Sequence, residues 1–392
     1  MNPARTMTET QNPSPRGGFT LVEILIVIAI IGILMAIAIP AVNRALIRGR
    51  ETTMRLEINA IEQAAEQYLQ KYGDYPPDGS DQNVLSRHMR RLFPRMAQPD
   101  LTLMDRLMDN SINNAAGVFS PVAMDRGEAI VFFLGGFSND VQHPITGKGG
   151  PLALLSSAAV GSQNILDYQY NATRDNSFFD FNAARLTMDR ASDVLPLLST
   201  DETLLGNTAA FYGGNDPLPS YRCRDNSNSP LLYFDSRTYG VVSAAGASPV
   251  VYNGFATSNF GGLRPYKTEI GVDAPVGAYY ATEAEAFNAV KFHNPDTYQI
   301  LSPGMDNVYG SLLSIVASNP GARPVHFVTE TGRAVTPIFG TGVTGLNSLI
   351  FTAPGLGSKG FQDVDWVSGI DVNGNLDNVT NFTESTLEGA LQ

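Results

Sequence analysis

The sequence contains one long apolar run near its start, from Gly17 to Val42. Between Phe19 and Val42 only Thr20 and Glu23 are polar. A helix of roughly 20 apolar residues is long enough to cross a bilayer, so the run predicts a membrane-spanning helix over residues 19–42. Because Arg5 and Arg16 precede it and no second run of this kind follows, we expect the N-terminus to be cytoplasmic and the rest of the chain to lie across the membrane.

Glu23 is an acidic side chain inside the predicted membrane span. A carboxylate at that depth is costly and is usually kept for a function, with a partner that offsets the cost. A cut between Gly18 and Phe19 would place a positive α-amino group on Phe19 at a similar depth. Within one helix this group and Glu23 are poorly aligned, whereas staggered helices of neighbouring copies can bring them together. We therefore interpret Glu23 as a contact between copies of the chain.

The junction between the short polar leader and the apolar run has a distinctive sequence: Gly18, Phe19, Thr20, Leu21, Val22 and Glu23. This junction resembles the class III signal of type IV pilins and type II secretion pseudopilins. The resemblance implies cleavage after Gly18 by a prepilin peptidase, N-methylation of Phe19 and an assembly role for Glu23. An ordinary signal anchor is the alternative, but a secretory signal has a shorter apolar core, and its small-residue cleavage site comes after that core.

The resemblance extends to location, partners and function. It implies a single-pass inner-membrane protein with a cytoplasmic N-terminus and a head in the periplasm or in an extracytoplasmic filament. The implied partners are other copies of the chain in a homo-polymer, other pilin-like subunits, the prepilin peptidase and an inner-membrane assembly platform. The chain most resembles a G-type major pseudopilin with an enlarged head, which makes it a structural subunit of a type II secretion pseudopilus or a type IV pilus-like filament.

Two other functions stay open for the same sequence. One is a minor tip or adhesive subunit that binds a partner or substrate through the large head. The other is a membrane-anchored periplasmic enzyme, which lacks support because the sequence has no nucleophile-elbow or zinc motif. The four histidines are scattered, and two glycine-rich matches at residues 340–345 and 355–360 do not lead into helices. We therefore expect no catalytic residues and no enzyme activity.

The helical pattern continues beyond the membrane span. Apolar residues recur at steps of three and four, which predicts an amphipathic continuation over residues 43–73: Met54, Ile58, Ile61, Ala65, Tyr68 and Tyr72. Pro40 lies inside the predicted helix and removes one backbone hydrogen bond, so a kink or local melt is expected there, which would permit a bend as the helix leaves the bilayer. Gly73, Pro76 and Pro77 predict the end of the helix.

The sequence divides into five parts. Residues 1–18 form a cleaved leader, 19–42 the transmembrane helix and 43–73 its amphipathic continuation. Residues 74–230 form a helix- and loop-rich insertion region with short helices at 84–93 and 100–109, and residues 231–392 form a β-rich head with an acidic C-terminal loop and one helix at 281–292. The expected fold is therefore α+β and pilin-like, with a long N-terminal helix packed on an antiparallel β-sheet enlarged by insertions.

The overall charge limits the range of partners. The chain has 38 acidic and 26 basic residues, and its net charge is −12. Such a chain repels nucleic acid, and we identify no basic patch outside the region of the anchor. Cys223 is the only cysteine, so a disulfide framework is absent and a small packed side chain is expected.

The C-terminal region carries a possible calcium site. Oxygen ligands of the kind that a hard cation prefers are closely spaced there: Asp363, Asp365, Asp371, Asn373, Asn375 and Asp377. An Asx-rich turn between strands is the alternative. In G-type pseudopilins, a loop resembling residues 302–310 runs on into an acidic DNxT-like segment and binds calcium, so the resemblance implies Ca²⁺ as a cofactor here. In this sequence the two segments are far apart, which leaves the individual ligands open.

Overall fold

The computed structural model describes residues 20–107, 124–188, 198–199, 216–223, 229–239, 265–270, 279–280, 290–305, 307, 309, 326–328, 333–339, 347–351, 378–384 and 386. The chain forms two compact units, Met1–Gly49 and Arg50–Gln392.

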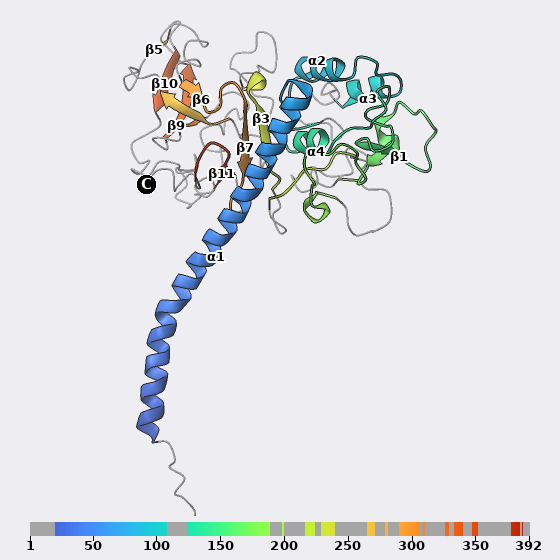
Figure 1. Cartoon of the computed structure of the whole chain (residues 1–392). Helices are drawn as coiled ribbons and strands as arrows, with labels where there is room; N and C mark the ends of the chain where they lie inside the picture. The colour runs from blue at the N-terminus through green and yellow to red at the C-terminus, as the bar shows by residue number, and fades with distance from the viewer. Residues whose placement is uncertain are drawn as a thin grey trace, which may run out of the picture. The chain divides into compact units, whose positions relative to one another are not determined.

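The longest element is α1, which runs from Leu21 to Tyr72 (Figure 1). The predicted transmembrane helix and its amphipathic continuation are therefore one helix. The helix is continuous through Pro40, so the local melt considered from the sequence is absent in this structure. Gly73 follows in the left-handed region with φ +74°, and its N–H donates to the carbonyl of Leu69 at 2.6 Å. A glycine in this conformation is a common helix terminator, which explains the end at Tyr72.

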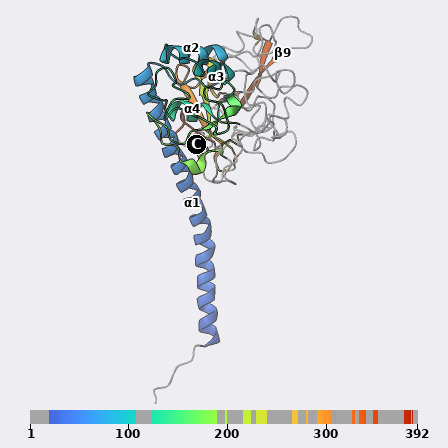
Figure 2. The ribbon, with the colours of Figure 1, turned by 90° about the vertical axis from the view of Figure 1, so that its right-hand side faces the viewer.

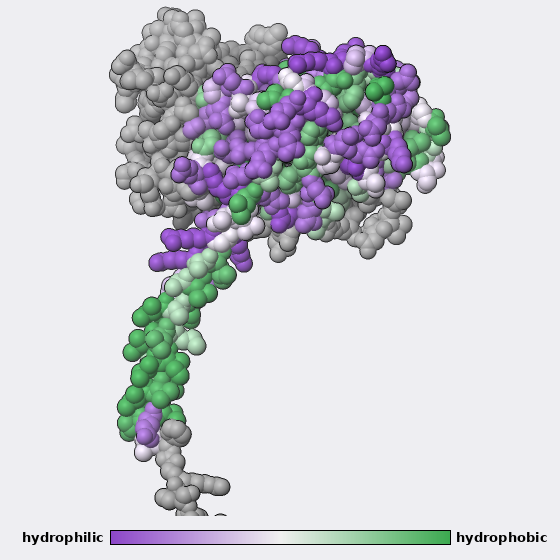
Figure 3. Space-filling view, in the orientation of Figure 1, coloured by the Kyte–Doolittle hydropathy of each residue, from purple (hydrophilic) through white to green (hydrophobic). Residues whose placement is uncertain are grey.

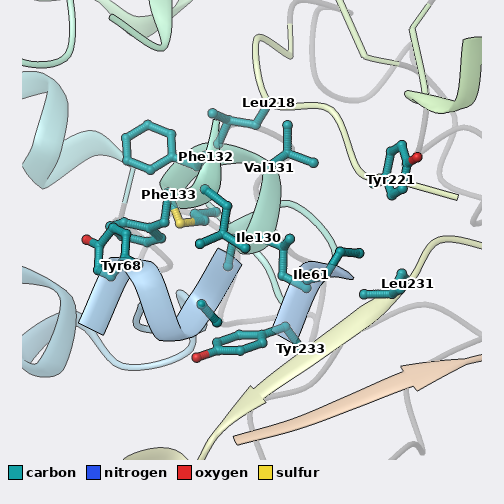
Figure 4. Close-up of a cluster of buried hydrophobic side chains, with 14 of the residues drawn as sticks. Ile61, Tyr68, Ile130, Val131, Phe132, Phe133, Leu218, Tyr221, Leu231 and Tyr233 are labelled. Carbon is teal, nitrogen blue, oxygen red and sulfur yellow. The ribbon is translucent and has the colours of Figure 1, made fainter. Parts of the chain in front are cut away.

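The last turns of α1 form the centre of the second unit's core. The buried residues follow the predicted stripe, except that Ala64 is added and Tyr72 is only half-buried: Met54, Ile58, Ile61, Ala64, Ala65 and Tyr68. Helix α4 (Ala129–Leu134) packs in the same cluster and all six of its residues are buried. Figure 4 shows side chains of α1 and α4 facing one another, with Ile61 also close to Tyr233. Burial on this scale is the dominant stabilising contribution to a fold.

Two further helices lie where the sequence predicted them. Helix α2 (Gln82–Leu92) begins at Asp81, whose Oδ1 accepts from the N–H of Val84 at 2.8 Å, and α3 spans Asp100–Arg106. Figures 1 and 2 both show α2 and α4 beside the last turns of α1. Short 3₁₀ turns at Ile165–Asp167, Ala183–Arg185 and Ser236–Thr238 and a two-stranded ladder of β1 (Leu152–Leu154) and β2 (Tyr168–Tyr170) complete this part.

A three-stranded antiparallel sheet packs on α1. Its order is β11–β7–β3, with β3 at Leu232–Asp235, β7 at Tyr298–Ser302 and β11 at Val379–Thr380, and every residue of these strands is buried. The side chain of Asn381 connects the sheet to the helix, because its Nδ2 donates to Glu62 Oε1 at 3.1 Å while its Oδ1 accepts from the N–H of Ile300 at 2.8 Å. The expected helix-on-sheet arrangement and the α+β class are therefore confirmed.

The second sheet has six strands in the order β5–β10–β9–β8–β4–β6. They span β4 (Lys267–Ile270), β5 (Tyr279–Tyr280), β6 (Val290–Phe292), β8 (His326–Val328), β9 (Arg333–Phe339) and β10 (Asn347–Phe351). The β4–β8 pair is parallel and the other pairs are antiparallel, so this sheet is mixed. The predicted helix at 281–292 is wrong at its end, because residues 290–292 pair with β4 as a strand; residues 281–289 lie outside the described part.

A buried carboxylate joins the loop after α1 to the three-stranded sheet. Asp78 is fully buried, and its Oδ2 accepts from Arg126 Nε at 3.0 Å, from Thr238 Oγ1 at 2.6 Å and from the N–H of Asp235 at 3.2 Å. Its Oδ1 accepts from Ser80. Burial alone would raise the pKa of Asp78, but the Arg126 charge and the hydrogen bonds outweigh it and hold that pKa below its usual value.

Candidate processing and assembly site

The first turn of α1 holds Glu23 in a reciprocal pair of hydrogen bonds with Thr20. Glu23 Oε2 accepts from the Thr20 backbone N–H at 2.7 Å and from the Thr20 hydroxyl at 2.8 Å. The Glu23 N–H donates to Thr20 Oγ1 at 3.2 Å. This is a capping box, in which two backbone donors of a helix start are satisfied by two side chains. The T-x-x-E spacing of Thr20 and Glu23 is the sequence signal for this role of Thr20.

The cleavage site itself is not part of the described structure. Gly18 and Phe19 both lie among the residues outside it. Glu23 therefore has a described partner in Thr20, while its predicted contact with the Phe19 amino group of a neighbouring copy stays a prediction.

The surface around Glu23 is almost entirely apolar. Each large apolar side chain from Leu21 to Val42 is between 47% and 80% exposed, and Figure 3 shows this part of α1 as a continuous hydrophobic surface. Within the described part of the chain, α1 is the one helix long and apolar enough to cross a membrane. Exposed apolar surface of this extent is stable only in lipid or against other proteins. The Thr20–Glu23 pair and Pro40 therefore both lie in a segment that must be covered.

The predicted calcium ligands are not described. Asp363, Asp365, Asp371, Asn373, Asn375 and Asp377 all lie outside the described residues. Among the described residues, no group of three or more acidic, histidine or cysteine side chains gathers in a way that could hold a metal ion.

The fold nevertheless brings together the two segments that the calcium interpretation requires. Val379 pairs with Ser302, at the start of the loop, and Asn378 Nδ2 donates to the carbonyl of Tyr309 at 3.4 Å. Asn378 is fully buried, and its Oδ1 has no hydrogen-bond partner among the described residues. A buried oxygen without a donor fits a nearby cation, because leaving it unpaired is otherwise costly. The pairing of β11 with β7 thus brings together two segments that are far apart in the sequence.

One buried cluster has the residue types of a catalytic triad. Tyr68 Oη lies 2.8 Å from His88 Nε2, and His88 Nδ1 lies 3.6 Å from Asp74 Oδ2. Tyr68 is completely buried and His88 is only 2% exposed, so a substrate cannot reach either group. Burial also lowers the pKa of His88, which favours the neutral ring. The cluster therefore serves to pack α2 against α1.

Cys223 is a free, buried thiol, as predicted. Burial raises its pKa to about 12, so the thiolate does not form at neutral pH. The expectation that no basic patch exists outside the anchor region is wrong, because four exposed arginines gather on and just after α2: Arg87, Arg90, Arg91 and Arg95. The net charge of −12 is a sum over the whole chain, so it does not reveal a local cluster of positive side chains.

Comparison with known proteins assigns the N-terminal segment. Residues 13–39 match the family described as the prokaryotic N-terminal methylation motif. The type IV major pilin protein PilE of Neisseria gonorrhoeae is 38% identical over 69 residues, which are 18% of this chain and 41% of the pilin. A fimbrial protein of Neisseria meningitidis is 36% identical over 69 residues, with the same coverage. A fimbrial protein of Pseudomonas aeruginosa is 51% identical over 49 residues, which are 12% of this chain and 32% of that protein.

The family match is confined to residues 13–39, and each of these relatives matches less than a fifth of the chain. The chain spans about two fifths or less of the length of these relatives. No solved structure matches the chain. The methylation motif, the pilin relatives and the long apolar helix that begins with Thr20 and Glu23 together show that a short part of this chain, which includes its N-terminal segment, is similar to type IV pilins.

Proposed function

We propose that this chain is a structural subunit of a filament, either a type IV pilus-like fibre or a type II secretion pseudopilus. The observation that carries the proposal is a lone glutamate near the start of an exposed apolar helix, within the matched methylation motif. In the proposed sequence of events, a prepilin peptidase cleaves after Gly18 and methylates Phe19. An inner-membrane platform then lifts the subunit from the bilayer into the filament.

The contact between subunits follows from the electrostatics of the anchor. Before assembly, Thr20 supplies Glu23 with two hydrogen-bond donors, which lowers the cost of the carboxylate in lipid. This pairing supplies no positive charge to Glu23, and the described residues place no cation beside it. In the proposed filament, the Phe19 amino group of a neighbouring copy supplies that cation, in a medium of low dielectric constant where opposite charges attract strongly. Pro40 permits α1 to adjust as it leaves the bilayer.

A minor tip or adhesive role is the second candidate, and the size of the second unit favours it. The same 69 residues are 18% of this chain and 41% of the gonococcal pilin, so this chain is more than twice as long. The second unit of this chain includes α2, α3 and the six-stranded sheet. In this role a few copies at the filament end would present the large unit to a binding partner. Quantitative immunogold labelling separates the two roles, because a main subunit labels the whole length and a tip subunit labels one end.

The first prediction concerns processing. We expect the mature protein to begin at Phe19 and to carry one methyl group on its α-amino nitrogen. The cut creates the cation that Glu23 requires, which gives a physical reason for its position. Intact-mass analysis of the chain from a host with a prepilin peptidase should show loss of residues 1–18 and the mass of one added methyl group. The same chain from a peptidase-deficient host is the control, and a mature N-terminus elsewhere would contradict the proposal.

We also propose a calcium site at the C-terminal region, formed by Asp371, Asp377 and one or more of Asp363, Asp365, Asn373 and Asn375. The buried Oδ1 of Asn378, next to Asp377, supports this location. The carboxylates would repel one another when the fold brings them together, and a bound cation would convert that repulsion into a link between the C-terminal segment and β7.

The second prediction tests that link. A ligand that binds only the native state at about 100 times its dissociation constant adds roughly 2.7 kcal/mol to the free energy of unfolding. We therefore expect the melting temperature of the detergent-solubilised chain to rise with calcium relative to chelator. The Asp377→Ala variant should lose the difference, whereas Asp105→Ala, an exposed position on α3, should keep it. Equal melting temperatures of the unsubstituted chain in both buffers would leave the Asx-rich turn as the interpretation.

A further inference from the structure

Helix α2 and the turn after it carry a concentration of exposed positive charge. The four side chains, which we call the α2 arginine patch, are Arg87, Arg90, Arg91 and Arg95. The sequence has no acidic residue between Asp81 and Asp100, although the chain as a whole has 38 acidic and 26 basic residues. The patch is therefore positively charged, although the chain as a whole is negatively charged.

Contacts within the chain account for only part of the patch. Arg91 Nη2 donates to the carbonyl of Gly73 at 3.0 Å, and Arg91 Nη1 lies 3.8 Å from Asp74 Oδ2, which makes an ion pair. Arg90 Nε donates to Ser86 Oγ at 3.2 Å. Both residues lie in the last turn of α2, where a positive charge is stabilised by the helix dipole. Arg87 lies a turn earlier and Arg95 lies beyond the helix, and neither forms an ion pair or hydrogen bond with any residue that the structure describes.

The spacing of the arginines carries a cost to stability. Arg87, Arg90 and Arg91 stand at positions i, i+3 and i+4, so their charges share one face of α2 and repel one another. The opposite face packs in the core through Leu85, His88 and Met89, which prevents the helix from rotating the charges apart. Asp74 offsets this repulsion only at Arg91, whereas Arg87 and Arg95 have no acidic partner in the described part of the chain, which points to a partner outside the chain.

We propose that the α2 arginine patch docks on an acidic surface of a second copy of this chain. The inference rests on the proposed filament function and adds a contact between the large units to the contact between the N-terminal helices. Copies with a net charge of −12 repel one another, so a contact between them needs concentrated opposite charge on one side. Arginine is suited to this contact because its guanidinium pairs with carboxylates through two parallel hydrogen bonds.

The proposed contact also has the geometry that a filament requires. A basic patch that binds an acidic surface uses two different regions of the same molecule. When the contact is heterologous, each copy keeps one region unoccupied, so the contact can repeat from subunit to subunit without closing. Two arginine patches repel one another, so they do not face each other directly in the contact.

The test places a photo-cross-linking amino acid at Asn83, which is exposed and lies one helical turn before Arg87. In cells that assemble the full chain into filaments, illumination should give an adduct of two copies, with the acceptor peptide rich in Asp and Glu. The Arg87→Glu/Arg90→Glu variant should reduce this adduct at least about tenfold, since it replaces attraction by repulsion. A matched control, Arg106→Glu/Lys148→Glu, makes the same change in net charge at exposed sites outside the patch and should leave the adduct unchanged.

The possible outcomes separate this inference from the proposed function. Filaments at normal yield without the two-copy adduct overturn the inference and leave the filament function intact. An adduct with a different protein or with nucleic acid overturns it as well, as does an equal loss in the control variant. Absence of filaments from the unsubstituted chain, with all assembly components present, overturns the proposed function and the inference together. The melting temperature of both double variants is measured in parallel, and an unchanged value shows that the loss is not due to unfolding.

Discussion

Replacing Glu23 by alanine should leave the chain inserted in the membrane but reduce filaments by roughly 100-fold or more. In the single subunit, the substitution removes a costly charge from lipid, so insertion should not suffer. In the filament, it leaves the Phe19 amino group of a neighbouring copy buried without its partner. Breaking a buried ion pair in this way costs about 3–5 kcal/mol, and each 1.4 kcal/mol is about a tenfold change in an equilibrium constant.

Two further variants at this site distinguish charge from helix capping. Glu23→Gln keeps an oxygen that can accept from Thr20 but lacks the negative charge, so we expect it to be as defective as Glu23→Ala. Thr20→Val removes the hydroxyl that bonds Glu23 Oε2 at 2.8 Å but keeps the carboxylate, so it should assemble better than either. Each variant is expressed as the sole copy, and filaments are sheared, pelleted and quantified against the membrane fraction. Normal filament abundance with Glu23→Ala would refute the proposed contact.

Replacing Asp78 by alanine should destabilise the second unit by about 3–5 kcal/mol, the usual cost of removing one member of a buried ion pair. Arg126, whose side chain is only 3% exposed, would keep its charge without the carboxylate 3.0 Å away. Thr238 and the backbone N–H of Asp235 would lose their acceptor as well. The free energy of unfolding of an ordinary domain is about 5–15 kcal/mol, so the substitution would remove a large share of the second unit's stability.

Chemical denaturation of the detergent-solubilised chain measures this loss. Asp105→Ala is the matched control, because Asp105 is exposed and a surface substitution changes stability by about 0.5 kcal/mol or less. The double variant Asp78→Ala/Arg126→Met should recover part of the loss, since it removes the buried charge that Asp78 no longer offsets and fills the space with an apolar side chain. A loss below about 1 kcal/mol for Asp78→Ala would mean that water reaches Arg126 and that the pair is not buried in solution.

The sequence predicted most clearly the parts of the fold that depend on local periodicity. The apolar run, the stripe from Met54 to Tyr72 and the glycine at 73 together determine α1, because helix hydrogen bonds are local and its end needs only a left-handed residue. The T-x-x-E spacing also determines the capping of Glu23. Helices α2 and α3 were found for the same reason, whereas residues 290–292 became a strand because pairing with β4 outweighed a local helical pattern.

Tertiary structure alone decided which distant residues meet. Nothing in the sequence pairs Asp78 with Arg126 and Thr238, or joins Asn378 to Tyr309, because those contacts arise from the packing of segments far apart in the chain. The same holds for the α2 arginine patch. Its four arginines can be read from the sequence, but their exposure cannot. They are exposed because Leu85, His88 and Met89 anchor the other face of α2 in the core. Among the described residues, Arg87 and Arg95 also lack partners. Local hydrogen bonding thus specifies the helix, while burial decides which of its charges remain available to a partner.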